Sequence, residues 1–259
     1  MSDTPSAPAL PLAGDTAWVT GAGSGIGRAV ALAFAAAGAR AGCIDRNEAG
    51  ILETLEQVRR KGATGAACPC AVDDAEALAR ALPELEGTLG APDMLVNCAG
   101  ISERHRAETF PNEAGSRILE VNLGGAFRLC RHVAPGMIRR AAGRIVNISS
   151  VGGSAGYPGT IAYLASKGGL EQMIRGLTAE WGEHGVTVNA IAPTLVATPV
   201  MEQMRAEAPE RIDRMLNRAP IRRMVETSEV ADAVLFLCSR SAGMINSHTL
   251  PLDGGYLAT

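Results

Sequence analysis

The pair of residues in this chain best suited to moving a proton is Tyr163 and Lys167, four positions apart. Their segment has a helical pattern, in which residues i and i+4 share one face. A free phenol has a pKa of about 10, too high for an efficient general base at neutral pH. A nearby ammonium favours the phenolate and so lowers that pKa. The pair therefore predicts acid–base chemistry at an alcohol or a carbonyl, although most isolated Tyr–Lys pairs are solvated helix edges.

Two polar residues earlier in the chain support this interpretation. Ser150 stands 13 residues before Tyr163, at the end of an apolar, β-branched run. Its hydroxyl is placed to hydrogen-bond a substrate oxygen, whereas strand alternation points Ser149 elsewhere. Asn122 interrupts an otherwise apolar helical pattern, where asparagine is unfavourable. A water-linked proton path to Lys167 would give its amide partners, and a bond to neighbouring backbone is the structural alternative.

A glycine-rich string near the N-terminus predicts a phosphate site. Thr20-Gly21-Ala22-Gly23-Ser24-Gly25-Ile26-Gly27 follows a short apolar run and opens a helical segment. Glycines there permit a tight turn and close approach of a pyrophosphate, and the helix N-terminus offers unpaired N–H groups. Asp45 lies 18 residues beyond Gly27, at the end of the next strand pattern. A carboxylate there favours the ribose hydroxyls of NAD and repels the 2′-phosphate of NADP, whereas Arg46 could pair with that phosphate.

The elements that position these residues alternate along the chain. Short strand-like runs cover residues 17–20, 41–45, 94–97, 144–148, 186–191 and 248–252. Helical patterns cover residues 28–37, 48–61, 75–85, 162–181 and 228–237. Strands separated by such helices need crossover connections. The sequence therefore predicts a three-layer, doubly wound parallel sheet of the Rossmann type, with about seven strands and helices on both faces.

The chain has 259 residues, which favours one domain. We predict a flexible tail over residues 1–12, one catalytic domain over residues 13–259, and a substrate lid over residues 199–223. The last segment is rich in Met, Arg and Glu and interrupts the strand–helix rhythm.

Composition argues against several classes of partner. The net charge of −3 and the lack of a basic block argue against nucleic acid and anionic membranes. No apolar run is long enough to span a bilayer, and the start of the chain has no signal-peptide pattern. The six cysteines are scattered, as expected of reduced thiols in a cytoplasmic protein. The histidines show no metal-ligand spacing, so we predict no metal site.

Taken in order, these motifs resemble those of the short-chain dehydrogenase/reductase family, in its compact single-domain form. The resemblance runs from about residue 15 to residue 257 and adds three motifs: Asn97-Cys98-Ala99-Gly100, the stretch from Asn189 to Thr198, and Asp253-Gly254-Gly255. It implies that Tyr163 is the general acid/base, that Ser150 orients the substrate, and that Lys167 holds the nicotinamide ribose and lowers the Tyr163 pKa. Asn122 would anchor a relay water. The implied cofactor contacts are Gly21, Ser24, Gly25, Ile26, Gly27, Asp45, Val72, Asn97, Ala99, Gly100, Tyr163, Lys167, Pro193, Val196 and Thr198. The resemblance also implies a homotetramer built partly through the helix that carries Tyr163.

The chain departs from the family pattern at four places. Cys98 replaces a second asparagine, Thr194 replaces a glycine, and Asn246-Ser247 stands where Thr-Gly is common. Ala71 and Val72 occupy the place of the acidic residue expected beside the adenine, which displaces Asp73 from that contact.

The substrate signal is weaker than the cofactor signal. Arg104, His105 and Arg106 place three potential cations together after Gly100, where they could bind an anionic or polyhydroxylated substrate or simply form a solvated loop tip. Methionines in and just after the lid segment predict either an adaptable apolar cover or plain packing; they are Met201, Met204, Met215 and Met224.

The leading hypothesis is an NAD-linked oxidoreductase for a small-molecule secondary alcohol, such as a sugar or hydroxy acid. The alternative enzyme is a 3-oxoacyl-thioester reductase that uses NADPH. A non-catalytic nucleotide-binding regulator is the third hypothesis; it would show a broken Ser, Tyr or Lys position, and all three are intact.

Overall fold

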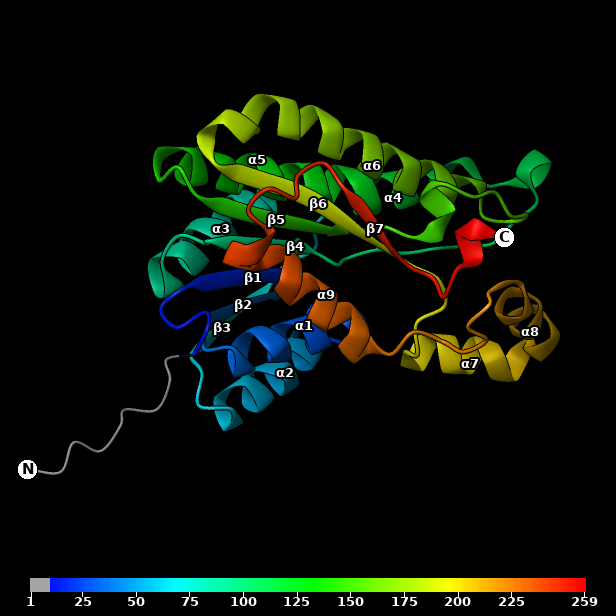
Figure 1. Ribbon diagram of the computed structural model, residues 1–259, viewed down its shortest axis with the longest axis horizontal. Coiled ribbons are helices and arrows are strands. Elements are labelled where there is room, and N and C mark those ends of the chain that lie inside the picture. The colour runs from blue at the N-terminus through cyan, green and yellow to red at the C-terminus, as the bar shows by residue number, and fades with distance from the viewer. Residues whose placement is uncertain (1–9) are drawn as a thin grey trace, which may run out of the picture.

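The computed structural model describes residues 10–259 (Figure 1). Residues 1–9 of the predicted tail lie outside the described part. The remainder of that tail already belongs to the fold: Leu12 is buried, and its N–H donates to the Ala37 carbonyl at 2.9 Å. The chain is thus packed on the domain a few residues before the expected boundary.

A single parallel sheet runs through the molecule in the order β3-β2-β1-β4-β5-β6-β7. Its strands are β1 Thr16–Thr20, β2 Arg40–Asp45, β3 Gly65–Pro69, β4 Met94–Asn97, β5 Gly143–Ile148, β6 Val186–Pro193 and β7 Thr249–Leu252. Strands β1, β4 and β6 are buried along their whole length. Such continuous burial is expected of parallel strands covered on both faces, and it explains their apolar, β-branched composition.

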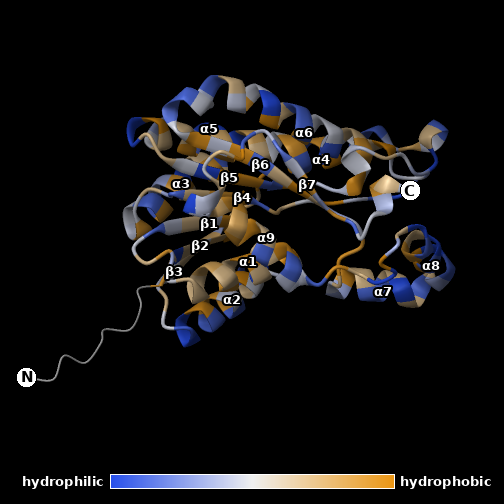
Figure 2. Cartoon of the chain, viewed as in Figure 1, coloured by the Kyte–Doolittle hydropathy of each residue, from blue (hydrophilic) through white to orange (hydrophobic). Residues whose placement is uncertain are grey.

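Helices cover both faces of this sheet, which confirms the predicted three-layer architecture (Figure 1). One layer holds α1 Gly25–Ala36, α2 Glu48–Arg60 and α9 Thr227–Cys238. The other holds α3 Ala75–Leu89, α4 Asn112–Leu119, α5 Gly125–Arg139 and α6 Ile161–Trp181. Each layer packs its own hydrophobic core against the sheet. In Figure 2 the strands are largely orange, while blue residues gather on the outer sides of the helices.

The strand order reverses direction between β1 and β4, because the chain first adds β2 and β3 on one side and then crosses to the other. A crevice forms outside the carboxyl ends of the strands at such a point and is the usual ligand site of this architecture. Thr20, Asp45 and Asn97 end β1, β2 and β4, so the predicted site residues gather at this edge.

Two features differ from a simple strand–helix alternation. Residues Glu120–Gly124 form a π-helical turn between α4 and α5, where the sequence indicated ordinary helix. The predicted lid consists of α7 Pro199–Glu207 and α8 Pro209–Arg218 (Figure 1). No helix within residues 10–259 is both long and apolar enough to cross a bilayer.

Candidate active site

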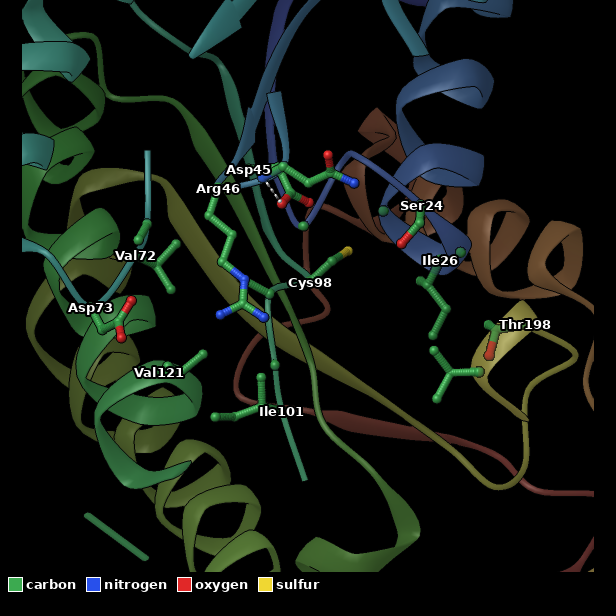
Figure 3. Close-up of a pocket in the computed structure, with 18 of the residues that line it drawn as sticks. Ser24, Ile26, Asp45, Arg46, Val72, Asp73, Cys98, Ile101, Val121 and Thr198 are labelled. Carbon is green, nitrogen blue, oxygen red and sulfur yellow. Dashed lines mark hydrogen bonds between the residues drawn. The ribbon is translucent and has the colours of Figure 1, made fainter. Parts of the chain in front are cut away.

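Two adjoining cavities lie at the carboxyl ends of the strands. The first has a volume of about 470 Å³ and is lined by the glycine-rich loop, the end of β2 and the segments after β3 and β4 (Figure 3). The second has a volume of about 570 Å³ and is lined by segments after β4, β5 and β6, by α6 and by the α7–α8 hairpin. Ile26, Gly100 and Thr198 line both. One long ligand could therefore occupy the two cavities together.

The glycine-rich loop has a conformation that larger residues would not allow. Gly21 and Gly25 have φ angles of 66° and 51°, in the left-handed region. A Cβ on Gly27 would lie 2.1 Å from the Gly21 carbonyl oxygen, so loop and helix approach too closely for any side chain. Ser24 precedes α1, and its side chain makes no capping hydrogen bond there. The first turn of this 12-residue helix lines the cavity without a side-chain cap, and an anion there would be stabilised by its N–H groups.

Asp45 and Arg46 lie at the far end of the first cavity (Figure 3). Asp45 Oδ2 accepts a hydrogen bond from the Gly23 N–H at 3.0 Å, and Oδ1 accepts one from the Asn47 N–H at 2.9 Å. The carboxylate therefore also holds the glycine-rich loop. Val72 and Asp73, from the segment after β3, line the same cavity across from Ile26 and Thr198. Asp73 lines the cavity after all, from two positions beyond the place where the family pattern puts its acidic residue.

Tyr163, Lys167 and Ser150 all line the second cavity. Lys167 Nζ donates to the Ile148 carbonyl at 2.7 Å and lies 5.6 Å from the centroid of the Tyr163 ring. Burial lowers the pKa of Lys167 to about 8, although Cys98 and Glu171 oppose this shift. Burial, with a smaller contribution from Tyr157, raises the pKa of Tyr163 to about 12, against hydrogen bonding to Ser150. The surroundings of Tyr163 therefore favour the neutral phenol. Burial raises the pKa of Tyr163 by more than the expected effect of the Lys167 ammonium lowers it.

The two serines after β5 both line the second cavity, but their hydroxyl groups have different partners. Ser150 lines the cavity, and its Oγ accepts the Gly152 N–H at 3.1 Å. Ser149 Oγ instead donates to Glu171 Oε1 at 2.8 Å. Glu171 is a buried carboxylate one helical turn beyond Lys167, and it was not predicted as a site residue from the sequence. Its i+4 spacing from Lys167 was the available signal.

Asn122 uses its side chain to hold the strand-end segment after β4. Its Oδ1 accepts the Ile101 N–H at 2.8 Å, and its Nδ2 donates to the Ile101 carbonyl and to Ser166 Oγ, both at 3.0 Å. Asn122 thus bonds to backbone groups, as in the structural alternative to a water-linked proton path. The Ser166 hydroxyl of α6 is a further partner. The π-helical turn turns this amide inward, between the β4 segment and α6.

The residues expected to contact the cofactor do not all line the same cavity. Gly21, Ser24, Gly25, Ile26, Gly27, Asp45, Val72, Ala99, Gly100 and Thr198 line the first cavity, and Pro193 and Val196 line the second. Asn97 lines neither. Its Nδ2 donates to Asn147 Oδ1 at 2.9 Å, a buried bond between β4 and β5. The expected direct contact from the Asn97 side chain is therefore replaced by bracing of the two strands beneath the cavity.

The departures from the family pattern find simple structural roles. Thr194 is not among the residues with positive φ, so no glycine is needed there. Asn246 Oδ1 accepts hydrogen bonds from Thr178 Oγ1, the Val188 N–H and the Ser247 N–H. It thereby ties the C-terminal segment to β6 and α6.

Among the candidate substrate residues, Arg104 lines the second cavity, whereas His105 and Arg106 do not. Met201, Met204 and Met215 also line this cavity, and Met224 is buried in the small cluster that they join. Met201, Met204 and Met215 therefore both cover the cavity and pack against one another, which are the two roles that the sequence left open. Among residues 10–259 there is no group of three or more His, Cys, Asp or Glu side chains suited to a metal ion.

These features fit a nicotinamide dinucleotide. The glycine cradle leaves room for a pyrophosphate at the α1 N-terminus, Asp45 lines the same cavity, and Ser150, Tyr163 and Lys167 border the adjoining one. A family model described as enoyl-(acyl carrier protein) reductase matches residues 21–257.

Relatives match over almost the whole chain. Galactitol 2-dehydrogenase (L-tagatose-forming) of Cereibacter sphaeroides is 41% identical over 95% of this chain and 96% of its own length. The crystal structure of a 3-oxoacyl-[acyl-carrier protein] reductase of Brucella melitensis, with bound NAD, is 33% identical with a TM-score of 0.87, over 99% of this chain and 98% of that one. A crystal structure described as a 2-deoxy-d-gluconate 3-dehydrogenase of Agrobacterium tumefaciens, with bound NADP, is 31% identical with a TM-score of 0.89, over 98% of this chain and 100% of that one. The chain therefore belongs to the short-chain dehydrogenase/reductase family, and it is an oxidoreductase for alcohols that binds a nicotinamide cofactor.

Proposed function

We propose that the protein is an NAD-dependent dehydrogenase/reductase that interconverts a secondary alcohol of the sugar or hydroxy-acid class and its carbonyl. The observation that carries this proposal is the convergence of Tyr163, Ser150 and Lys167 on one cavity that adjoins the glycine-rich loop. The similarity to a galactitol dehydrogenase supports a polyhydroxylated substrate.

Each residue of this set has a separate task. A bound nicotinamide supplies the hydride acceptor, or the hydride itself in the reverse direction. In oxidation, Tyr163 must first lose its proton; the substrate hydroxyl, hydrogen-bonded to Ser150, then passes its proton to the phenolate Oη as the carbinol carbon loses a hydride. In reduction, the neutral phenol gives that proton to the carbonyl oxygen and is left as the phenolate. Lys167 supplies the positive charge that stabilises the phenolate. Asn122 is a positioning residue, because its bonds to Ile101 and Ser166 fix the cavity wall between β4 and α6.

NAD is the cofactor that we propose, because the Asp45 carboxylate lies where the 2′-phosphate of NADP would come close. Arg46 borders the same cavity and is the residue that would favour NADP. In this proposal the carboxylate has the larger effect, since its hydrogen bonds to Gly23 and Asn47 fix it in place.

A 3-oxoacyl-thioester reductase is the second candidate, favoured by the similarity to the reductase of Brucella melitensis. Turnover of acetoacetyl-thioester with each cofactor separates the two proposals. A non-catalytic regulator would bind cofactor and transfer no hydride to any member of a broad alcohol panel.

We also propose that the chain assembles as a homotetramer, partly through α6. Leu119, Phe127 and Ile161 are apolar side chains exposed on α4, α5 and α6, in the layer that contains this helix. In this proposal another copy of the chain covers these apolar side chains.

The central test of the proposal is the variant Tyr163→Phe. It removes the proton-transferring oxygen and keeps the ring, so we expect turnover to fall by at least about a thousandfold, in the upper range for a general acid–base group. Cofactor affinity, measured by fluorescence titration, should change little. Substantial residual activity would remove Tyr163 from the proposed role. Tyr256→Phe, a buried tyrosine outside both cavity linings, is the matched control.

A further inference from the structure

Two guanidinium groups border the second cavity and have no part in the proton transfer. Arg104 comes from the segment after β4, and Arg211 comes from α8 of the lid hairpin. They share the cavity with Ser150 and Tyr163. The two arginines are 107 positions apart in sequence, and the fold brings them together at the place where the substrate would lie.

Neither guanidinium has an acidic partner among residues 10–259. Arg104 Nη2 donates to the Pro158 carbonyl at 2.9 Å, and Arg211 Nη2 contacts Met204 Sδ at 3.4 Å. Glu103 also lines the cavity, but its carboxylate lies 3.5 Å from His105 Nε2. By contrast, Arg106 is paired with Glu108 outside the cavity. Several donors on each planar guanidinium group therefore remain available for a ligand.

The two positive charges influence each other across the cavity. Burial lowers the pKa of Arg211, and repulsion from Arg104 lowers it further. Both arginines stay charged at any ordinary pH, so they repel each other. An anion bound between them would offset that repulsion. Tyr157 lines the same cavity; burial raises its pKa, and the charges of Arg104 and Arg211 oppose that shift. The arginines therefore border the same cavity, of about 570 Å³, as Ser150 and Tyr163.

We propose that the secondary alcohol oxidised here carries an oxyacid group, a carboxylate or a phosphate, which Arg104 and Arg211 bind while its hydroxyl meets Ser150 and Tyr163. The planar, forked guanidinium matches both groups through paired hydrogen bonds. The methionine side chains of the lid would contact the carbon chain between the two ends. The cofactor pyrophosphate is an unsuitable occupant, because the α1 N-terminus lies in the other cavity. This inference rests on the proposed function.

The test compares substrates of equal carbon number with NAD as cofactor: a neutral polyol, the corresponding aldonate and the polyol phosphate. We expect kcat/KM to be at least about tenfold higher for one of the two acids than for the polyol, and the preferred acid identifies the group. Arg104→Gln and Arg211→Gln should each raise the KM for that acid about tenfold to a hundredfold, the range of a lost charge-assisted hydrogen bond. KM for NAD should stay constant, and kcat/KM for the polyol should fall much less than kcat/KM for the acid. Arg106→Gln is the matched control and should change none of these values.

An equal or better rate with the neutral polyol, unchanged in both arginine variants, would overturn the inference and leave the proposed function intact. Oxidation of no alcohol in the panel would contradict the proposed function instead. In that case the anion site has its own readout: the aldonate or the phosphate should raise the melting temperature of the unmodified protein but not of the double arginine variant. Equal shifts in both proteins would contradict the anion site.

Discussion

At the scale of single residues, the environment of Lys167 and Tyr163 opposes their charged forms. Burial lowers the pKa of the lysine to about 8 and raises that of the tyrosine to about 12. At neutral pH the protein therefore holds a neutral phenol beside an ammonium whose pKa is only a little above the pH. This is the protonation state needed to donate a proton to a carbonyl.

The pH dependence of carbonyl reduction should report Lys167. Tyr163 keeps its proton up to about pH 12, so it remains a competent acid through the accessible range. Lys167 loses its charge as the pH rises through about 8, and stabilisation of the nascent phenolate is lost with it. We expect kcat/KM for reduction to be constant below pH 7 and to fall with a midpoint near pH 8, since kcat/KM reports pKa values of the free enzyme.

Lys167→Arg is the informative comparison, because a guanidinium stays charged at every pH used. Its lower activity should decline less between pH 7 and 9. An identical midpoint in this variant would assign the titration to another group.

Asp45 should set the preference for NAD. Asp45→Asn removes the charge and keeps an oxygen that can accept the loop N–H bonds now made by the carboxylate. We expect the ratio of kcat/KM with NAD to that with NADP to exceed one in the unmodified protein and to fall roughly tenfold in the variant, or about 1.4 kcal/mol. Arg46→Ala should raise the ratio. Equal use of both cofactors by the unmodified protein would contradict the assignment.

The residues that the sequence identified well are those whose spacing is local. Tyr163 with Lys167 follows from helical periodicity, and the glycines of the loop follow from a motif between a strand and a helix. Arg211 and Asp73 were missed as site residues, because only tertiary packing brings them to the cavities. Glu171, which accepts a hydrogen bond from Ser149, was missed although its spacing from Lys167 is local. For Asn97 the motif marked the correct place in the chain, but whether a side chain faces a ligand or a neighbouring strand is not encoded in the motif.

At the scale of elements, the turn between α5 and β5 contains a strained residue. Ala141 follows the helix end with φ of 49°, in the left-handed region that favours glycine. The Ala142 N–H donates to the Met137 carbonyl at 3.1 Å, so the helix is closed by a hydrogen-bonded turn that fixes this conformation. A side chain in that region costs about 1–2 kcal/mol.

Ala141→Gly should therefore stabilise the protein. The strain removed exceeds the added entropy of the unfolded chain, and we expect a net gain on the order of 0.5–1 kcal/mol, or about 2 °C in melting temperature. Differential scanning calorimetry measures this shift. Ala142→Gly is the matched control: its φ is not positive, so it should lower the melting temperature. A lower melting temperature for Ala141→Gly would contradict the proposed strain.

The elements that the sequence predicted best have strong periodicity. The strands at residues 94–97 and 144–148 were located to within one residue, because they are short, apolar and rich in branched side chains. Strand β3, Gly-Ala-Ala-Cys-Pro, has no β-branched residue, and its range was not identified from composition. The π-helical turn at Glu120–Gly124 was also missed, since one extra residue in a helix leaves almost no trace in a hydrophobic pattern.

At the scale of the whole molecule, the helix layer containing α6 is the candidate assembly surface. If the chain forms a homotetramer through it, light scattering should give four times the mass of one chain, and Phe127→Asp should lower that mass. Leu52→Asp is the control, since Leu52 is an exposed apolar residue of α2 in the opposite layer. A mass that is unaffected by Phe127→Asp would exclude that side chain from the interface.

The α7–α8 hairpin has a consequence for how this protein can evolve. Its apolar residues form a cluster of their own with Leu195 and Met224, separate from the two cores that hold the sheet. Substitutions there can alter the shape and charge of the substrate cavity without disturbing the packing beneath the cofactor. Natural selection can therefore vary this one wall of the second cavity, and with it the molecules that the cavity admits, without rebuilding the sheet.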